Sequence, residues 1–314
     1  MPNNQTKKLV QGSIAIVLFT IIMLIAFYVP IVSIVAMGFA PLPIAWLAAT
    51  HNRANAITIA IIASAITFIY GGIIMLLTSV IFAVVGVVVG DAIRTNKSKL
   101  FLFMSTGIAL LFTFAFLYVA LVNFFNLDFV KLGLDIAKTS YEQSLKVAEQ
   151  FPMQEAFTRE SLDEMFRMME VAMPSTITIS VFALTFVLIS INLPLLKRFG
   201  IDVPKFASFK MMRLPRAVLW YYLIVLSINL FVQPEVGTFL YVAVLNASVV
   251  LWLLLTLQGL SFIFFLLDEY KSPGFLKGLV VLIALPLYSF IILLGIIDLG
   301  FNIREYMKDK IQKK

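Results

Sequence analysis

Long stretches without charged residues alternate with short charged segments along the chain. Residues 9–52, 44 in all, contain no Lys, Arg, Asp or Glu, and residues 54–90 contain none either. As one helix, the first stretch would be about 66 Å long, roughly twice the hydrocarbon thickness of a bilayer. Each stretch is therefore predicted to fold back on itself, the first at Pro30 and the second at Tyr70-Gly71-Gly72.

The remaining uncharged stretches predict further passes across a membrane. Pro41 and Pro43 interrupt the second pass, which we expect to be kinked, broken or partly re-entrant. A run of 32 uncharged residues ends before Asp268, and it is too long for one upright helix and too short for two. A tilted or kinked helix is expected there, near Gln258-Gly259. The other predicted passes cover residues 100–127, 174–196, 217–232 and 278–298.

The charge pattern divides the chain into four segments. Residues 1–126 are predicted to hold about five spans, and residues 173–302 about four. Between them, residues 127–172 carry both acids and bases among apolar residues, which predicts one or two amphipathic helices outside the hydrocarbon, broken near Pro152. Residues 303–314 form a basic tail. The predicted fold is all-α: a polytopic helical membrane protein of about nine transmembrane helices, with eight as the alternative.

Composition agrees with this class. The chain is 61% hydrophobic and 13% charged, its mean hydropathy is +1.00, and soluble domains carry about 25% charged residues. These values exclude an ordinary soluble enzyme, a disordered chain and a nucleic-acid binder. The net charge of +7 is expected to reflect basic cytoplasmic loops that face anionic lipid.

The basic residues also predict an orientation in the cell membrane. With a cytoplasmic N-terminus, the inner side would hold the Lys and Arg residues within positions 7–8, 53, 94–99, 197–216 and 271–277. Residues 127–172, which we call the acidic segment, would then lie outside. Nine passes would then place the basic tail outside, against the positive-inside rule. Eight passes would remove that conflict.

Little in the sequence indicates catalysis. The chain has one histidine and no cysteine, and it lacks a phosphate-binding P-loop and a nucleophile elbow. Its acids near the spans fall at predicted span ends, unlike the mid-membrane carboxylates of ion-driven pumps. We therefore expect no catalytic residue, no metal site, no cofactor and no nucleotide hydrolysis by the chain itself.

Polar residues within the spans are the candidate site. Asn229, Asn246 and Gln258 are predicted either to bind a ligand or to link helices by hydrogen bonds. For Gln258 the two interpretations are about even, because a kink at Gly259 would expose backbone carbonyls. Asp298 and Arg304 are six residues apart, about 120° around a helix, so anchoring to neighbouring helices or head groups is favoured over direct pairing.

Three other features are interpreted as structural or interfacial. Pro30, Pro41 and Pro43 break helices, and His51 is expected to be a histidine of an interfacial loop rather than a pH sensor or ligand contact. Gly86 and Gly90 are four residues apart, which is typical of a close helix-packing face.

Several segments resemble the YybS-like family of uncharacterised bacterial membrane proteins. They are residues 23–99, including Ala40-Pro41-Leu42-Pro43-Ile44-Ala45-Trp46-Leu47, then Leu257-Gln258-Gly259-Leu260, and Leu294-Gly295-Ile296-Ile297-Asp298 followed by Arg304. The chain through about residue 197 also resembles the substrate-binding S components of energy-coupling-factor transporters. That resemblance implies a six-helix bundle that binds a small molecule. The first span lacks the A-x-x-x-A docking face of many S components, because the residue four positions after Ala15 is Phe19 and not alanine.

Two functions remain open from the sequence. The first is binding or translocation of a small molecule or lipid-like ligand, with the pocket among the first six helices. The alternative is a non-transporting scaffold or partner subunit of a signalling, envelope or division complex, which docks through the acidic segment and the basic loop 197–216. The expected partners are thus the lipid bilayer, a small-molecule ligand and a membrane protein, and no nucleic acid.

Overall fold

The chain folds into two compact units of helices. The computed structural model describes residues 4–148, 159–205, 208–284, 286–301 and 303–304, and in these ranges it contains helices and no strands. Unit 1 comprises Met1–Ser140 and Thr178–Lys205, and unit 2 comprises Tyr141–Ile177 and Phe206–Lys314. The break expected near Pro152 and most of the basic tail lie outside the described residues.

Prolines organise the first two passes of unit 1. Helix α1 (Asn4–Tyr28) ends just before the 3₁₀ turn η1 (Pro30–Val32), and α2 (Ser33–Phe39) and α3 (Leu42–Thr50) follow. Pro41 is the N-cap residue of α3 and Pro43 lies in its first turn, where a missing backbone N–H costs nothing. The prediction of a reversal at Pro30 and of a broken second pass is confirmed.

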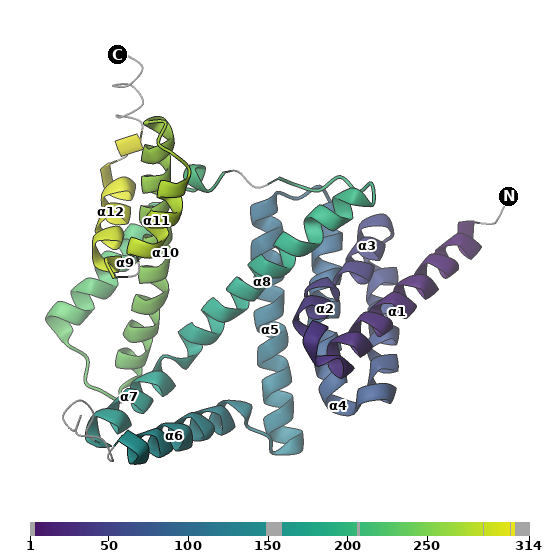
Figure 1. Ribbon diagram of the computed structural model, residues 1–314, viewed down its shortest axis with the longest axis horizontal. Helices are drawn as coiled ribbons and strands as arrows, with labels where there is room; N and C mark the ends of the chain where they lie inside the picture. Colours follow the sequence, from purple (N-terminus) through teal and green to yellow (C-terminus); the bar gives the residue numbers. More distant parts are fainter. Residues whose placement is uncertain (1–3, 149–158, 206–207, 285, 302, 305–314) are drawn as a thin grey trace. The chain divides into compact units, whose positions relative to one another are not determined.

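A second reversal occurs within α4 (Arg53–Arg94). Gly72 has φ 61° and ψ −155°, a conformation that only glycine adopts readily. A straight helix of this length would hold its ends about 63 Å apart, yet Asn52 and Arg94 line the same pocket. The two halves of α4 therefore run back along each other (Figure 1). The predicted turn at Tyr70-Gly71-Gly72 is confirmed.

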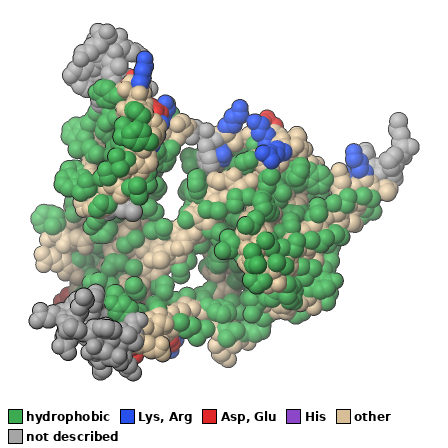
Figure 2. Space-filling view, in the orientation of Figure 1, with side chains coloured by type: hydrophobic (Ala, Val, Ile, Leu, Met, Phe, Trp, Pro, Cys, Tyr) green, Lys and Arg blue, Asp and Glu red, His purple; other side chains and the backbone are tan. Residues whose placement is uncertain are grey.

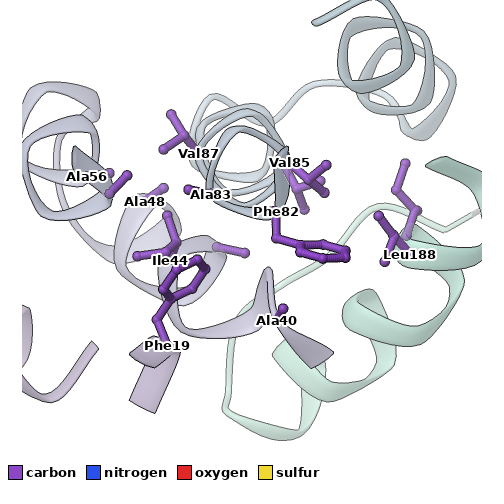
Figure 3. Packing of buried hydrophobic residues seen from close by; sticks show 14 of the residues in the cluster. Phe19, Ala40, Ile44, Ala48, Ala56, Phe82, Ala83, Val85, Val87 and Leu188 are labelled. Atoms are coloured by element: carbon purple, nitrogen blue, oxygen red, sulfur yellow. The ribbon is translucent and has the colours of Figure 1, made fainter. Parts of the chain in front are cut away.

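The core of unit 1 is built around close contacts between α3 and the second half of α4. A Cβ on Gly86 would lie 2.7 Å from the Pro41 carbonyl oxygen, and a Cβ on Gly90 would collide with that of Ala45. Small and branched side chains fill the space around this crossing (Figure 3), among them Ile44, Ala48, Ala83 and Val87. The small-residue packing face is confirmed.

Two longer helices complete unit 1. They are α5 (Lys99–Phe125) and α8 (Met173–Arg198), and Leu188 of α8 belongs to the same core as Phe82 (Figure 3). The buried Asn192 of α8 donates a hydrogen bond of 2.9 Å to the Gly38 carbonyl. This bond ties α8 to the broken second pass.

Unit 2 is centred on α10 (Phe239–Glu269), which packs against α12 (Tyr288–Phe301). A Cβ on Gly259 would collide with the Ile291 carbonyl oxygen, and one on Gly295 with that of Leu255. Gly259 thus permits a close helix crossing, and α10 continues through it as one α-helix. The expectation of a tilted or kinked helix at this point stays a prediction, since one unbroken α-helix is compatible with tilt.

Shorter helices surround this pair. They are α7 (Arg159–Val171), η2 (Phe209–Met211), α9 (Ala217–Ser227), the π-helical turn η3 (Ile228–Val232) and α11 (Phe275–Ala284). A further helix, α6 (Phe129–Ala148), precedes α7 in the sequence. The buried apolar residues of unit 2 include Leu255, Ile292 and Leu299.

The lengths of the helices support a polytopic membrane protein. Six described helices are long and apolar enough to cross a bilayer, or seven if the bent pair of α11 and α12 counts as one span. Because α4 reverses at Gly72, it supplies two passes instead of one, and the largest number of spans rises from seven to eight. The count reaches nine only if the shorter apolar segment Ala217–Val232 also crosses.

Apolar side chains face outward over much of each unit. Phe112 and Phe116, one helical turn apart on α5, are each 72% exposed. On the visible face, hydrophobic side chains cover the sides of the helices, whereas Lys and Arg gather near helix ends (Figure 2). Exposed apolar surface of this extent is unstable in water and matches the hydrocarbon of a bilayer.

The α3–α4 crossing generates a prediction. Gly90→Ala places a methyl group against the Ala45 carbonyl and is expected to lower the free energy of unfolding by about 1–3 kcal/mol, the usual range for overpacking. Heat unfolding in detergent measures the change. Gly133→Ala on α6 is the matched control, because nothing lies within 4 Å of its added Cβ. Equal melting temperatures for the two variants would contradict the close packing.

Candidate functional site

A polar pocket of about 460 Å³ lies at one end of unit 1. Three elements form it: the first turns of α1, the junction between α3 and α4, and the last turn of α4. Its lining residues are Lys7, Lys8, Gln11, Thr50, His51, Asn52 and Arg94. We call it the basic pocket, because three of these residues are lysine or arginine and none carries a carboxylate.

The cations of the basic pocket differ in their partners. Arg94 donates to Asp91 at 2.5 Å, one turn earlier on α4. One guanidinium carries five N–H donors, so this contact leaves others for a second anion. Lys7 and Lys8 are exposed and form no ion pair within the part of the chain that the structure describes.

Neutral polar groups line the rest of the basic pocket. The Thr50 hydroxyl donates to the Trp46 carbonyl at 2.9 Å and lies 2.9 Å from His51 Nδ1. This contact holds the His51 ring beside the end of α3. Asn52 Oδ1 accepts from the Asn55 N–H and caps α4, so the Asn52 amide NH₂ remains a donor.

A second polar group lies inside unit 2. We call Gln258, Ser261, Asp298 and Arg304 the polar network; each has an exposed fraction of 5% or less. The Arg304 guanidinium lies 2.6 Å from Asp298 Oδ2, and Gln258 Nε2 donates to the same oxygen at 2.6 Å. Arg304 also lies over the rings of Phe262 and Phe265, at 5.9 and 5.7 Å.

The polar network holds the segment 208–214 against α10 and α12. Arg304 donates to the Lys210 carbonyl at 2.7 Å, and the Ser261 hydroxyl contacts the carbonyls of Phe209 and Met212. Gln258 Oε1 accepts from the Leu214 N–H at 2.9 Å. This segment has little helix of its own, so side chains take the place of backbone partners.

The pairing of Asp298 with Arg304 corrects the expectation from their spacing. Two bonds from Arg304 Nε, at 2.9 and 3.1 Å, join the residues directly. Helical side chains lean toward the N-terminus, and a long arginine can therefore reach back over more than one turn. The angle of about 120° between the two Cα atoms around the helix axis disregards the length of the arginine side chain.

The three candidate ligand-binding amides are engaged in hydrogen bonds between helical segments. Asn246 accepts from the Ser175 N–H at 2.8 Å and donates to the Val171 carbonyl at 2.7 Å. Asn229 Nδ2 lies 3.4 Å from the Ser248 hydroxyl, a long and weak contact. Gln258 is part of the polar network. These contacts agree with a helix-linking role, and a ligand-binding role for the three residues stays a prediction.

The basic pocket is the feature that sequence reasoning missed. Residues 7–8, 51 and 94 are far apart in the chain, and they come together only because Pro30 and Gly72 reverse its direction. The sequence signal was the expectation that all of these residues lie on one side of the membrane. Among the described residues, no group of three or more His, Asp or Glu side chains could hold a metal ion.

These features define an integral membrane protein of the polytopic α-helical class. Comparison with known proteins gives its family: residues 17–299 match the model of the predicted membrane protein family DUF2232, and the chain belongs to that family. It is similar to the uncharacterized protein YybS of Bacillus subtilis (strain 168), with 28% identity over 97% of this chain and 99% of the relative. No solved structure matches the chain.

The buried ion pair generates a prediction about stability. Asp298→Asn leaves the Arg304 charge buried without its counter-ion, a change that typically costs about 3–5 kcal/mol. The double variant Asp298→Asn/Arg304→Gln removes both charges and should recover part of that loss in a heat-unfolding assay. Asp91→Asn, which breaks the more exposed pair with Arg94, should cost at most about 1 kcal/mol. A double variant less stable than Asp298→Asn would refute this account.

The amide contacts generate a second prediction. Asn246→Leu removes bonds to the backbone of residues 171 and 175 and should lower stability by about 1–2 kcal/mol. Asn229→Leu, which removes one weak contact, is the matched control and should change stability much less. Both are measured by thermal unfolding in the same detergent. The reverse ranking would show that the contacts described for Asn246 do not carry the stability.

Proposed function

We propose that this membrane protein binds a small molecule or lipid-like ligand in the basic pocket of unit 1, without hydrolysing nucleotide itself. The observation that carries the proposal is the pocket's lining: polar and cationic side chains from three elements converge on about 460 Å³. Ligand sites commonly have volumes of about 300–1,000 Å³ and use a few convergent polar groups to orient the ligand.

The position of the basic pocket supports this function. It lies where α1 begins, where α3 ends and where both halves of α4 have their free ends. The ends of membrane spans lie near the head groups and the aqueous phase, so a ligand would reach the pocket without crossing hydrocarbon. Such a site suits a water-soluble molecule or the polar part of a lipid.

A scaffold or partner-subunit role is the alternative, and a separate observation favours it. The amides of Asn246 and Gln258, which would be ligand contacts in the middle of the bundle, already have protein partners. The close glycine contacts of α10 with α12 also fill space that a central cavity would need. A scaffold needs a firmly packed helical bundle and no central ligand cavity, which agrees with these contacts.

Native mass spectrometry of the gently solubilised full-length protein tests the proposal. A stoichiometric small molecule or lipid is expected on the wild type and should be lost from Lys8→Glu/Arg94→Glu, which reverses two charges of the basic pocket. Lys97→Glu/Lys131→Glu changes the net charge equally at exposed positions outside the pocket and should keep the ligand. A wild type that carries only another protein would refute ligand binding and favour the scaffold.

A further inference from the structure

The donors of the basic pocket restrict the chemistry of its ligand, given the ligand-binding function proposed above. Lys7, Lys8 and Arg94 supply N–H groups with positive charge, and Gln11 and Asn52 add amide donors. Among the residues that the structure describes, no carboxylate lines the pocket to attract a cation. The matching ligand group is therefore an anion with several acceptor oxygens.

A phosphate group fits this donor set better than a carboxylate does. A carboxylate has two oxygens in one plane, whereas a phosphate directs its oxygens toward several sides. The donors here come from separate elements: Lys7 and Lys8 from α1, Asn52 from the α3–α4 junction and Arg94 from the end of α4. Lysine and arginine are also the usual protein partners of phosphate.

The two lysines are the residues most available for this role. They lie side by side in the first turns of α1, are exposed and have no ion-pair partner among the described residues. Both lysines line the same pocket as Arg94, so their like charges repel one another there, and an anion that binds in the pocket relieves that repulsion. Arg94 can take part without leaving Asp91, because its guanidinium has more donors than that contact uses.

We infer that the basic pocket is a binding site for a phosphate-bearing anion, held by Lys7 and Lys8 at the start of α1 and by Arg94 at the end of α4. Two sources present this group at a membrane surface. One is the head group of an anionic phospholipid, whose acyl chains would lie along the apolar exterior of unit 1. The other is a free phosphorylated small molecule in the aqueous phase.

The experiment uses the full-length protein in nanodiscs and separates the two sources. In one arm, nanodiscs combine phosphatidylcholine with phosphatidylglycerol, and native mass spectrometry counts the phosphatidylglycerol molecules that stay bound. In the other arm, nanodiscs contain phosphatidylcholine alone, and inorganic phosphate or glycerol 3-phosphate is titrated while the melting temperature is followed. Retained phosphatidylglycerol identifies a head-group site, and a saturable rise in melting temperature identifies a free phosphate compound.

The variants link binding to the named residues. Lys7→Gln/Lys8→Gln should weaken binding of the effective probe at least about tenfold, because a charge-assisted hydrogen bond to the anion is lost at each position. Arg94→Gln, in a different element, should weaken it in the same direction. Lys97→Gln/Lys131→Gln is the matched control: it removes the same charge from exposed positions of unit 1 and should leave binding within about twofold.

Three results would overturn the inference. One is no binding of either probe class to the wild type. Another is an equal loss for the pocket and control double variants, which would indicate diffuse attraction to basic surface. The third is an uncharged molecule that co-purifies with the protein and is lost from Lys8→Glu/Arg94→Glu, which would leave the ligand-binding function intact and refute the phosphate chemistry alone.

Discussion

Polar groups buried in an apolar surrounding are stabilised by partners within the protein, and that requirement shapes unit 2 above all. Water is absent from the hydrocarbon, so an unpaired amide or charge there costs several kcal/mol. In unit 2, Asp298 and Arg304 neutralise each other, Gln258 donates a hydrogen bond to Asp298, and Ser261 accepts one from Arg304. The backbone of residues 209–214 depends on the same side chains, so a segment without regular hydrogen bonding becomes a fixed part of the fold.

Close approach of helices is the other requirement, because lipid gives no hydrophobic force between them. Gly86 and Gly90 let α3 contact the backbone of α4, and Gly259 and Gly295 do the same for α10 and α12. At such distances, dispersion contacts become numerous and small errors in volume are costly. The bulky side chains of Phe112 and Phe116 on α5 instead face outward, away from such crossings.

The sequence was informative wherever a local rule acted alone. The length of the uncharged stretches and the chemistry of Pro30 and Gly72 predicted the reversals, and Pro41 predicted the interruption of the second pass. These effects depend on the residue and its immediate neighbours. It was less informative wherever distant residues meet. The approach of Lys8 to Arg94 depends on two reversals, and the Asp298–Arg304 pair depends on how far a flexible side chain extends. The spacing of residues along an ideal helix gives the direction in which each side chain leaves the helix axis, but not how far a long side chain reaches along the helix.

Among the described cations, those that are paired within the protein differ from those that are available to a ligand. Arg304 is buried and fully surrounded by acceptors and aromatic rings, and Lys210 and Lys277 share Asp268. An anion that approached any of these cations would meet a charge that already has a carboxylate partner, and its attraction would be correspondingly weaker. Lys7 and Lys8 have no partner to lose among the described residues, so the attraction of an incoming anion is offset only by desolvation of the two ammonium groups. For this reason we propose the basic pocket, rather than the more deeply buried polar network, as the ligand site.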